Sequence, residues 1–111
     1  MMFPDDDNGE VLRQMAESGV DLSVEHSVEF AHLAPNQQVA ETFAEQAHEL
    51  GFTVEVYDPD AEALAEGKTH WDVICIREMI PTHHDITSIE TELAALARKN
   101  GCREDGWGFF V

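Results

Sequence analysis

The sequence has few basic residues, and this shortage is its clearest chemical property. Lysine and arginine together number 6, against 23 aspartate and glutamate residues, so the 111-residue chain carries a formal net charge of −17. A field this negative repels phosphate backbones and anionic membrane surfaces, which disfavours direct binding of nucleic acids or membranes. Such a charge would instead attract a basic partner. The alternative is that it only keeps the protein soluble.

Long apolar runs and cysteine pairs are also missing. No apolar stretch approaches the ~20 residues that span a membrane, and no basic segment followed by an apolar one marks a secretion signal. The two cysteines, Cys75 and Cys102, lie in apolar segments without Cys-x-x-Cys spacing. We therefore expect a cytoplasmic protein with two buried free thiols. A disulfide is the less favoured alternative, because Cys75 lies in the middle of an expected strand.

The usual sequence signals of catalytic sites are absent as well. Gly-rich phosphate-binding loops do not occur, and Cys75 lies in the most apolar stretch, where a thiol is unreactive. Among the six histidines, no two have His-x-x-x-His spacing. The neighbours His83 and His84 would point about 100° apart on a helix. We expect no enzyme activity, no catalytic residue, no metal site and no cofactor.

The chain does contain enough apolar material for one folded domain over residues 1–111. Apolar residues make up 43% of the sequence, which is too much for a disordered acidic segment. The charge is unevenly distributed. Residues 1–66 hold 16 acids and one base, a net charge of −15, whereas residues 67–111 hold 7 acids and 5 bases, a net charge of −2. We expect a basic partner to contact the first of these two parts.

Hydrophobic periodicity predicts an extra helix followed by two β-α-β units. Helical spacing of apolar residues alternates along the chain with the period of two that is typical of strands. Residues 60–69 are small and charged, and we expect a connection there that can include a helical turn. The expected elements are helices at about 1–20, 39–50 and 82–100, a strand from residue 24 that Pro35 closes, a strand at 52–57, a strand from residue 71 that Pro81 stops, and an aromatic strand at the C-terminus.

This order predicts an α+β domain with a ferredoxin-like βαββαβ core at about 23–111. Right-handed crossovers place the two main helices on one face of an antiparallel four-stranded sheet. The expected strand order across the sheet is fourth, first, third, second. The opposite face is then either open or covered by the N-terminal helix.

Acidic residues repeat along one side of the helix expected at 39–50. Glu41, Glu45 and Glu49 follow one another at intervals of four residues, and we call them the acidic helix face. The apolar residues of the helix lie on the other side. Like charges at this spacing destabilise a helix, and no lysine or arginine in the helix compensates for them. The acidic helix face is either an ordinary solvated surface or a docking surface for a basic segment.

Three further acids, Glu25, Glu29 and Glu55, point away from the side that their strands bury. If that buried side lies under the helices, these acids make the open face of the sheet acidic. In RNA-binding proteins of the same topology this face is aromatic and basic. Here it would attract cations instead. These three glutamates and the three of the acidic helix face are therefore our six candidate partner-binding residues.

Asp105-Gly106-Trp107-Gly108 predicts a tight turn that leads into the aromatic final strand. Gly106 can adopt a positive φ at no steric cost, and Gly108 leaves a gap where a backbone or a ring can approach closely. Trp107 either anchors the strand in the core or is an exposed anchor for a partner. His26 alternates with core residues in the first strand, and we expect it to be a hydrogen-bonded core residue.

Four motifs of this chain together resemble those of a known family. No single one is specific, but the Asp-Gly-Trp-Gly motif near the C-terminus is distinctive. The resemblance covers nearly the whole chain, and the family is that of the regulators of ribonuclease E activity B, protein inhibitors of this bacterial endoribonuclease. The motifs, in order, are Val24-Glu25-His26, Leu50-Gly51-Phe52-Thr53-Val54, Asp72-Val73-Ile74-Cys75 and Asp105-Gly106-Trp107-Gly108.

The resemblance implies a cytoplasmic, non-enzymatic regulator that binds the basic, Arg-rich scaffold portion of ribonuclease E and slows RNA decay. The acidic first part of the chain fits such a partner, with modest affinity and strong salt dependence. Better-known members carry a further acidic tail after the aromatic strand, whereas this sequence stops at Val111. The alternative is a ferredoxin-like small-molecule-sensing or dimerisation domain without a ribonuclease partner. We expect a monomer or a weak homodimer.

Overall fold

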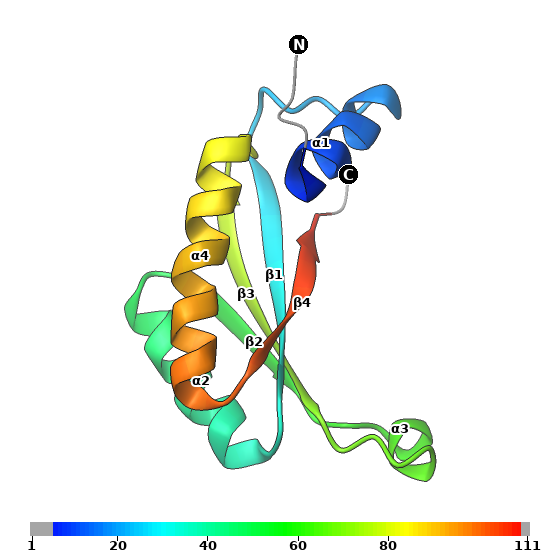
Figure 1. The fold of residues 1–111 in the computed structure, drawn as a ribbon, viewed down its shortest axis with the longest axis vertical. Helices are drawn as coiled ribbons and strands as arrows, with labels where there is room; N and C mark the ends of the chain where they lie inside the picture. The colour runs from blue at the N-terminus through cyan, green and yellow to red at the C-terminus, as the bar shows by residue number, and fades with distance from the viewer. Residues whose placement is uncertain (1–5, 110–111) are drawn as a thin grey trace.

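A computed structural model describes residues 6–109 of the chain. Within this range four helices alternate with four strands (Figure 1). Residues 1–5, and with them the start of the expected first helix, lie outside the described residues, as do Phe110 and Val111 of the expected aromatic strand. The elements are α1 (Asp7–Glu17), β1 (His26–Ala34), α2 (Gln37–Glu49), β2 (Thr53–Tyr57), α3 (Ala61–Ala65), β3 (Trp71–Met79), α4 (His83–Asn100) and β4 (Arg103–Gly108).

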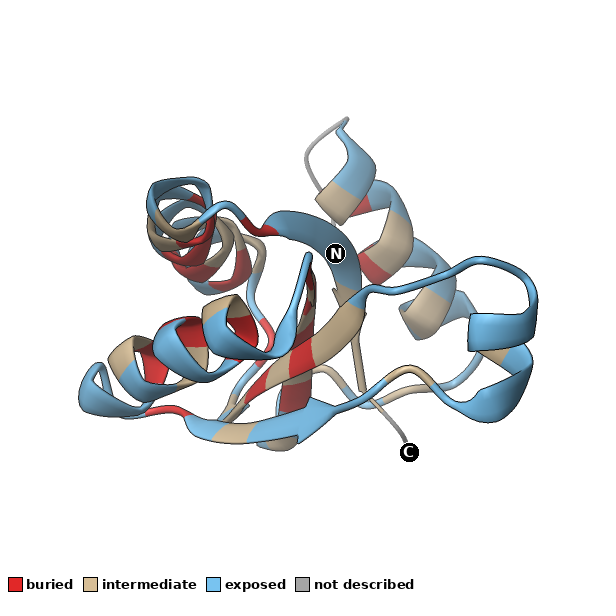
Figure 2. Cartoon of the chain, turned by 90° about the horizontal axis from the view of Figure 1, so that it is seen from below, coloured by how far each residue is buried: buried red, intermediate tan, exposed pale blue. Residues whose placement is uncertain are grey.

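The four strands form one antiparallel sheet with the order β2-β3-β1-β4. This is the strand order expected from the sequence, and the fold class is α+β as predicted. α2 and α4 pack against each other on one face of the sheet, and their buried residues point toward it (Figure 2). The short helix α3 lies in the connection at 60–69, at the end of an arm formed by β2 and β3 (Figure 1).

The core lies between the sheet and these two helices. In β1 every second residue from Val28 to Ala34 is buried, and the residues between them are half-buried. Phe43 of α2 and Leu93 of α4 are fully buried against this face. Each such side chain contributes about 1.5–3 kcal/mol through its removal from water, which fixes both helices on the sheet.

α1 extends the helical layer instead of covering the other face of the sheet. It packs against α4, and its Leu12 is fully buried. Its first turn is capped by Asp6, which accepts a hydrogen bond from the N–H of Gly9 at 2.8 Å. The sheet face opposite α2 and α4 is left without a packed helix among residues 6–109, and we call it the uncovered sheet face.

β1 and β3 end close to where the sequence predicted, and only the start of β1 differs. β1 begins at His26, so Val24, 47% exposed, lies before the strand, contrary to the prediction. β1 ends at Ala34, directly before Pro35, and β3 ends at Met79, two residues before Pro81. The two strands pair along their whole length, from His26 with Met79 to Ala34 with Trp71. The start of β1 therefore coincides with the end of its partner strand, which the local apolar pattern does not show.

The prediction of a tight turn at 105–108 is wrong, because all four residues lie inside β4. Between two cross-strand pairs with β1, Phe30–Trp107 and His32–Glu104, β4 has two residues and β1 has one. This arrangement is a β-bulge, and Gly106 has a φ of +93° in it. A glycine with positive φ serves a bulge as well as a turn, so the sequence alone did not distinguish them.

Candidate protein-binding surface

The acidic helix face is exposed along the whole of α2. Glu41, Glu45 and Glu49 are all exposed, while Phe43 and Ala47 on the other side are fully buried. Gln37 donates a hydrogen bond from its side-chain amide to Glu41 at 3.1 Å. Within residues 6–109 no ion pair is found for any of the three carboxylates. They are therefore arranged in a row with their charges uncompensated.

The helix holds this row in place because both of its ends are fixed. Asn36 caps the N-terminus by accepting a hydrogen bond from the N–H of Val39 at 2.9 Å. At the other end, Arg77 of β3 donates to the carbonyl oxygen of Leu50 at 3.0 Å and lies 3.8 Å from the ring centroid of Phe52. A cation is favourable at a helix C-terminus. Arg77 is thus engaged with the helix end and the aromatic ring.

The other three candidate glutamates lie away from α2, and only two of them are in the sheet. Glu29 pairs with Ile76 and Glu55 pairs with Ile74, so both project from the uncovered sheet face. Glu25 precedes β1 and is exposed. The acidic helix face and the sheet glutamates are therefore on opposite sides of the domain.

Glu55 also interacts with its neighbour on the uncovered face. The hydroxyl of Tyr57 donates a hydrogen bond to the Glu55 carboxylate at 2.5 Å. This hydrogen bond is the main reason why the pKa of Tyr57 is raised, with burial and the charges of Glu55 and Glu29 adding to it. Glu55 is therefore engaged with Tyr57 on the uncovered sheet face.

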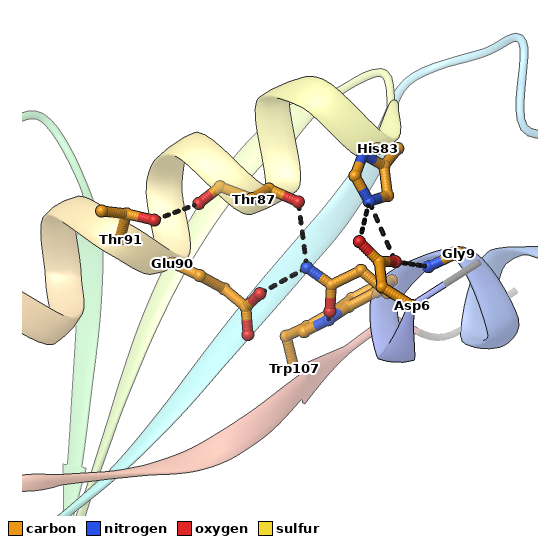
Figure 3. Close-up of polar contacts among 8 residues, drawn as sticks. Asp6, Gly9, His83, Thr87, Glu90, Thr91 and Trp107 are labelled. Carbon is orange, nitrogen blue, oxygen red and sulfur yellow. Dashed lines mark hydrogen bonds and ion pairs between the residues drawn. The ribbon is translucent and has the colours of Figure 1, made fainter. Parts of the chain in front are cut away.

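Trp107 is tied to α1 and α4 through one asparagine (Figure 3). Its indole N–H donates to the side-chain oxygen of Asn8 at 2.9 Å. The amide nitrogen of Asn8 donates in turn to Thr87 at 3.1 Å and to Glu90 at 2.5 Å. Burial raises the pKa of Glu90, and the hydrogen bond from Asn8 opposes that rise. We call these four residues the Asn8 junction; it connects α1, α4 and β4.

A contact between an imidazole and a carboxylate lies beside the Asn8 junction and joins the starts of α1 and α4. The imidazole of His83 contacts the carboxylate of Asp6 at 2.8 Å (Figure 3). The N–H of Gly9, and after it His83, lowers the pKa of Asp6. The contact between His83 and Asp6 was not anticipated from the sequence, in which the two residues are 77 positions apart.

The aromatic residues near the C-terminus form a short stack. Trp107 and Phe109 have ring centroids 6.4 Å apart, and Phe109 lies 4.5 Å from the ring of His26. His26 also contacts the carbonyl oxygen of Asp21 at 2.7 Å, but it is only half-buried. Trp107 is half-buried and packs against the core. The stack therefore belongs to the packing of β4, and the indole nitrogen is already occupied.

His32 is the buried histidine of this chain, although the sequence drew attention to His26. It is 2% exposed, and its ring meets Phe43 edge-on with centroids 4.9 Å apart. Its Nδ1 atom has no hydrogen-bond partner among the described residues. Burial lowers the pKa of His32. The sequence offered one signal of this burial: His32 lies on the same face of β1 as Val28 and Phe30, at intervals of two residues.

The two thiols are free and buried, as the sequence indicated. Burial raises the pKa of Cys75 to about 12, and burial likewise raises the pKa of Cys102. Both groups are therefore protonated and poorly nucleophilic near neutral pH. Over residues 6–109 no three His, Cys, Asp or Glu side chains are grouped so as to hold a metal ion. None of the helices described is long and apolar enough to cross a membrane.

Comparison with known proteins gives one consistent result. The protein named regulator of ribonuclease activity B from Pseudoalteromonas atlantica is 28% identical to this chain over 106 residues, which cover 93% of the chain and 86% of the relative. The family model of regulator of ribonuclease activity B matches residues 5–109, which is nearly the whole sequence. The chain therefore belongs to the family of regulators of ribonuclease activity B.

Proposed function

We propose that this protein is a cytoplasmic, non-catalytic inhibitor of ribonuclease E, and that it binds the basic scaffold region of that enzyme through the acidic helix face. The observation that supports this proposal best is the row of carboxylates at Glu41, Glu45 and Glu49, which is exposed and has no lysine or arginine beside it in α2. Membership of a family that regulates ribonuclease activity makes a ribonuclease the natural partner. In this proposal the ferredoxin-like domain acts by occupying the scaffold and so slows RNA decay.

The repulsion between the glutamates of α2 favours a binding role for this face over that of an ordinary solvated surface. Two like-charged pairs four residues apart, Glu41–Glu45 and Glu45–Glu49, each cost about 0.2–0.5 kcal/mol in an isolated helix. A basic segment laid along the row turns this repulsion into attraction. Because the carboxylates are fully hydrated when free, the net gain per ion pair is small, and affinity comes from several pairs acting together. The complex is therefore modest in affinity and sensitive to salt.

The glutamates of the uncovered sheet face form a second acidic area. A basic segment that contacts the acidic helix face must pass around an edge of the sheet before it reaches Glu29 or Glu55. A disordered scaffold segment can do so, because it has no fixed shape of its own. Glu25, in the connection before β1, belongs to the same second area in this proposal.

Inhibition of RNA cleavage tests the proposal. Cleavage of a model RNA by full-length ribonuclease E is measured with and without this protein, at low and at physiological salt. A ribonuclease E that lacks its basic scaffold is the matched control. We expect slower cleavage by the full-length enzyme, a weaker effect at higher salt and no effect on the truncated enzyme. Equal inhibition of both enzymes would place the contact on the catalytic part and reject the proposal.

A further inference from the structure

A groove of about 400 Å³ runs along β1 and β4 on the uncovered sheet face. It lies on the opposite side of the sheet from the acidic helix face, so it is separate from the contact proposed for Glu41, Glu45 and Glu49; Glu29 belongs both to the groove and to the second acidic area. We call it the glycine groove. Its floor and walls are formed by Glu29, Ala31, Ile74, Asp105, Gly106, Trp107, Gly108 and Phe109.

The groove exists because two residues of β4 have no side chain. Gly108 pairs with Glu29, so a side chain at position 108 would project from the uncovered face beside that glutamate. A Cβ atom added at Gly106 or at Gly108 would meet no other atom within 4 Å. Gly106 has a φ of +93° and is needed for the bulge, whereas Gly108 has no such backbone requirement. The space in front of Gly108 is therefore open, although the backbone conformation at this position does not require a glycine.

The walls of the groove carry negative charge, and its floor is apolar. Glu29 and Asp105 are its charged residues, and Ala31 and Ile74 supply its aliphatic side chains. Arg103, the basic residue nearest to the bulge in β4, lines a different hollow together with Asp72. Within the described residues, no lysine or arginine lines the glycine groove itself.

The charges of Asp105 and Glu29 also act on neighbouring groups on this side of the domain. Burial is the main cause of the raised pKa of Asp72, and the charge of Asp105 adds to it. The hydrogen bond with Glu55 is the main cause of the raised pKa of Tyr57, and the charge of Glu29 is the smallest of its contributions. The two carboxylates that line the groove attract a cation and repel an anion.

Arginine is the cationic side chain that suits an open, partly apolar groove. Its guanidinium is planar, weakly hydrated and able to bind a carboxylate through two parallel hydrogen bonds. A flat group can lie over the bare backbone at Gly108, and its methylene chain can cover Ala31 and Ile74. The lysine ammonium is more strongly hydrated and lacks the flat shape, so it gains less in the same place. We propose that the glycine groove binds an arginine side chain presented by a partner protein.

Nuclear magnetic resonance of the ¹⁵N-labelled protein tests this assignment with two short peptides. One alternates arginine with leucine, and the other has lysine in place of every arginine, so their charge and length are the same. We expect the arginine peptide to shift the amide signals of Glu29, Ala31, Ile74 and residues 104–108, with an affinity several-fold higher than that of the lysine peptide. Equal affinity of the two peptides, or shifts confined to α2, would overturn the proposal.

Two groove variants and one control variant separate binding in the groove from binding elsewhere on the surface. Gly108→Val fills the groove, and Thr53→Val, which adds the same side chain to an exposed position on the same sheet face, is its control. We expect at least a tenfold loss of arginine-peptide affinity for Gly108→Val and no change for Thr53→Val. The double variant Glu29→Gln, Asp105→Asn keeps the glycines and should lose binding to a similar extent. Unchanged binding in either groove variant would contradict the assignment.

The acidic helix face serves as the independent check. A variant with lysine at positions 41, 45 and 49 leaves the glycine groove intact, so it should still bind the arginine peptide there. If ribonuclease inhibition fails but the groove still selects arginine, the proposed function is rejected and the groove assignment stands. If inhibition is found but the groove does not select arginine, the groove assignment is rejected and the proposed function stands.

Discussion

The Asn8 junction and the acidic helix face are both polar, but they differ in how their groups are satisfied. At the junction, one asparagine makes hydrogen bonds to residues of α4 and β4, and the carboxylate of Glu90 is part of the network. On α2, three carboxylates stand in a row without an ion-pair partner among the described residues. Polar groups that find partners within the fold hold its elements together. Exposed carboxylates without an ion-pair partner are free to meet another protein.

The largest effect on stability is expected at Trp107, where the junction meets the core. Trp107→Ala removes a half-buried indole and its hydrogen bond to Asn8. We expect the free energy of unfolding to fall by about 2–4 kcal/mol, as for the loss of a large aromatic ring from a core. Urea titration followed by circular dichroism measures this loss. Trp107→Phe, which keeps a ring, should lose clearly less; a Trp107→Ala variant as stable as wild type would show that β4 is not held by this contact.

Asn8→Ala tests the polar part of the junction alone. It removes the donor that contacts Glu90 and Thr87 and leaves the indole N–H without its acceptor. Unsatisfied, partly buried groups cost about 1–3 kcal/mol in total, which is the expected decrease in the free energy of unfolding. The same urea titration checks it. Substitution of Asn36, the cap of α2, by alanine gives a comparison of about 1 kcal/mol for the loss of a single capping contact.

His32 is a buried polar group of a third kind, because its Nδ1 atom has no partner among the described residues. Burial lowers its pKa in the folded state below the ordinary value of 6.5. The unfolded chain therefore binds a proton that the folded chain does not, so stability falls as pH drops below that value. The slope for one proton is at most about 1.4 kcal/mol per pH unit. Urea titrations between pH 7 and pH 5 should show this loss, and His32→Leu should reduce it. An identical slope in the variant would assign the loss to other groups.

The smallest effect on stability is expected on the acidic helix face. Glu45→Gln removes both like-charge pairs of the row, so the free energy of unfolding should rise by about 0.4–1 kcal/mol. Thermal unfolding at low salt measures the gain, which should shrink at high salt as the repulsion is screened. A loss of stability in Glu45→Gln would mean that this glutamate has a partner in the fold, and the contrast with the junction would disappear.

Local sequence patterns predicted the elements whose causes are local. Helical spacing of apolar residues placed α2, whose Phe43 and Ala47 are fully buried. It also placed α4, which begins directly after Thr82, whose hydroxyl accepts from the N–H of Asp85 at 3.1 Å. The strand order followed from the chirality of the two crossovers. The same helical spacing placed Glu41, Glu45 and Glu49 on the exposed side of α2.

Contacts between distant parts of the chain could not be predicted in the same way. The bonds of Asn8 to Thr87 and Trp107 span 79 and 99 positions, and nothing in the local sequence distinguishes Asn8 from an ordinary capping residue. The bulge at Gly106 depends on the register between β4 and β1. The glycine groove in turn depends on this register, since it is formed by residues of three strands.

The proposal that the acidic helix face binds the basic scaffold of ribonuclease E is tested most directly by two matched triple variants. One carries Glu41→Lys, Glu45→Lys and Glu49→Lys; the other carries Glu17→Lys, Glu62→Lys and Glu92→Lys, at exposed positions of α1, α3 and α4. Both have the same change in net charge, and glutamate and lysine have similar helix propensities. The dissociation constant for a scaffold fragment at low salt is measured for each. We predict that binding is abolished in the first variant and weakened far less in the second. Equal affinities of the two variants would contradict the account, because binding would then follow net charge alone.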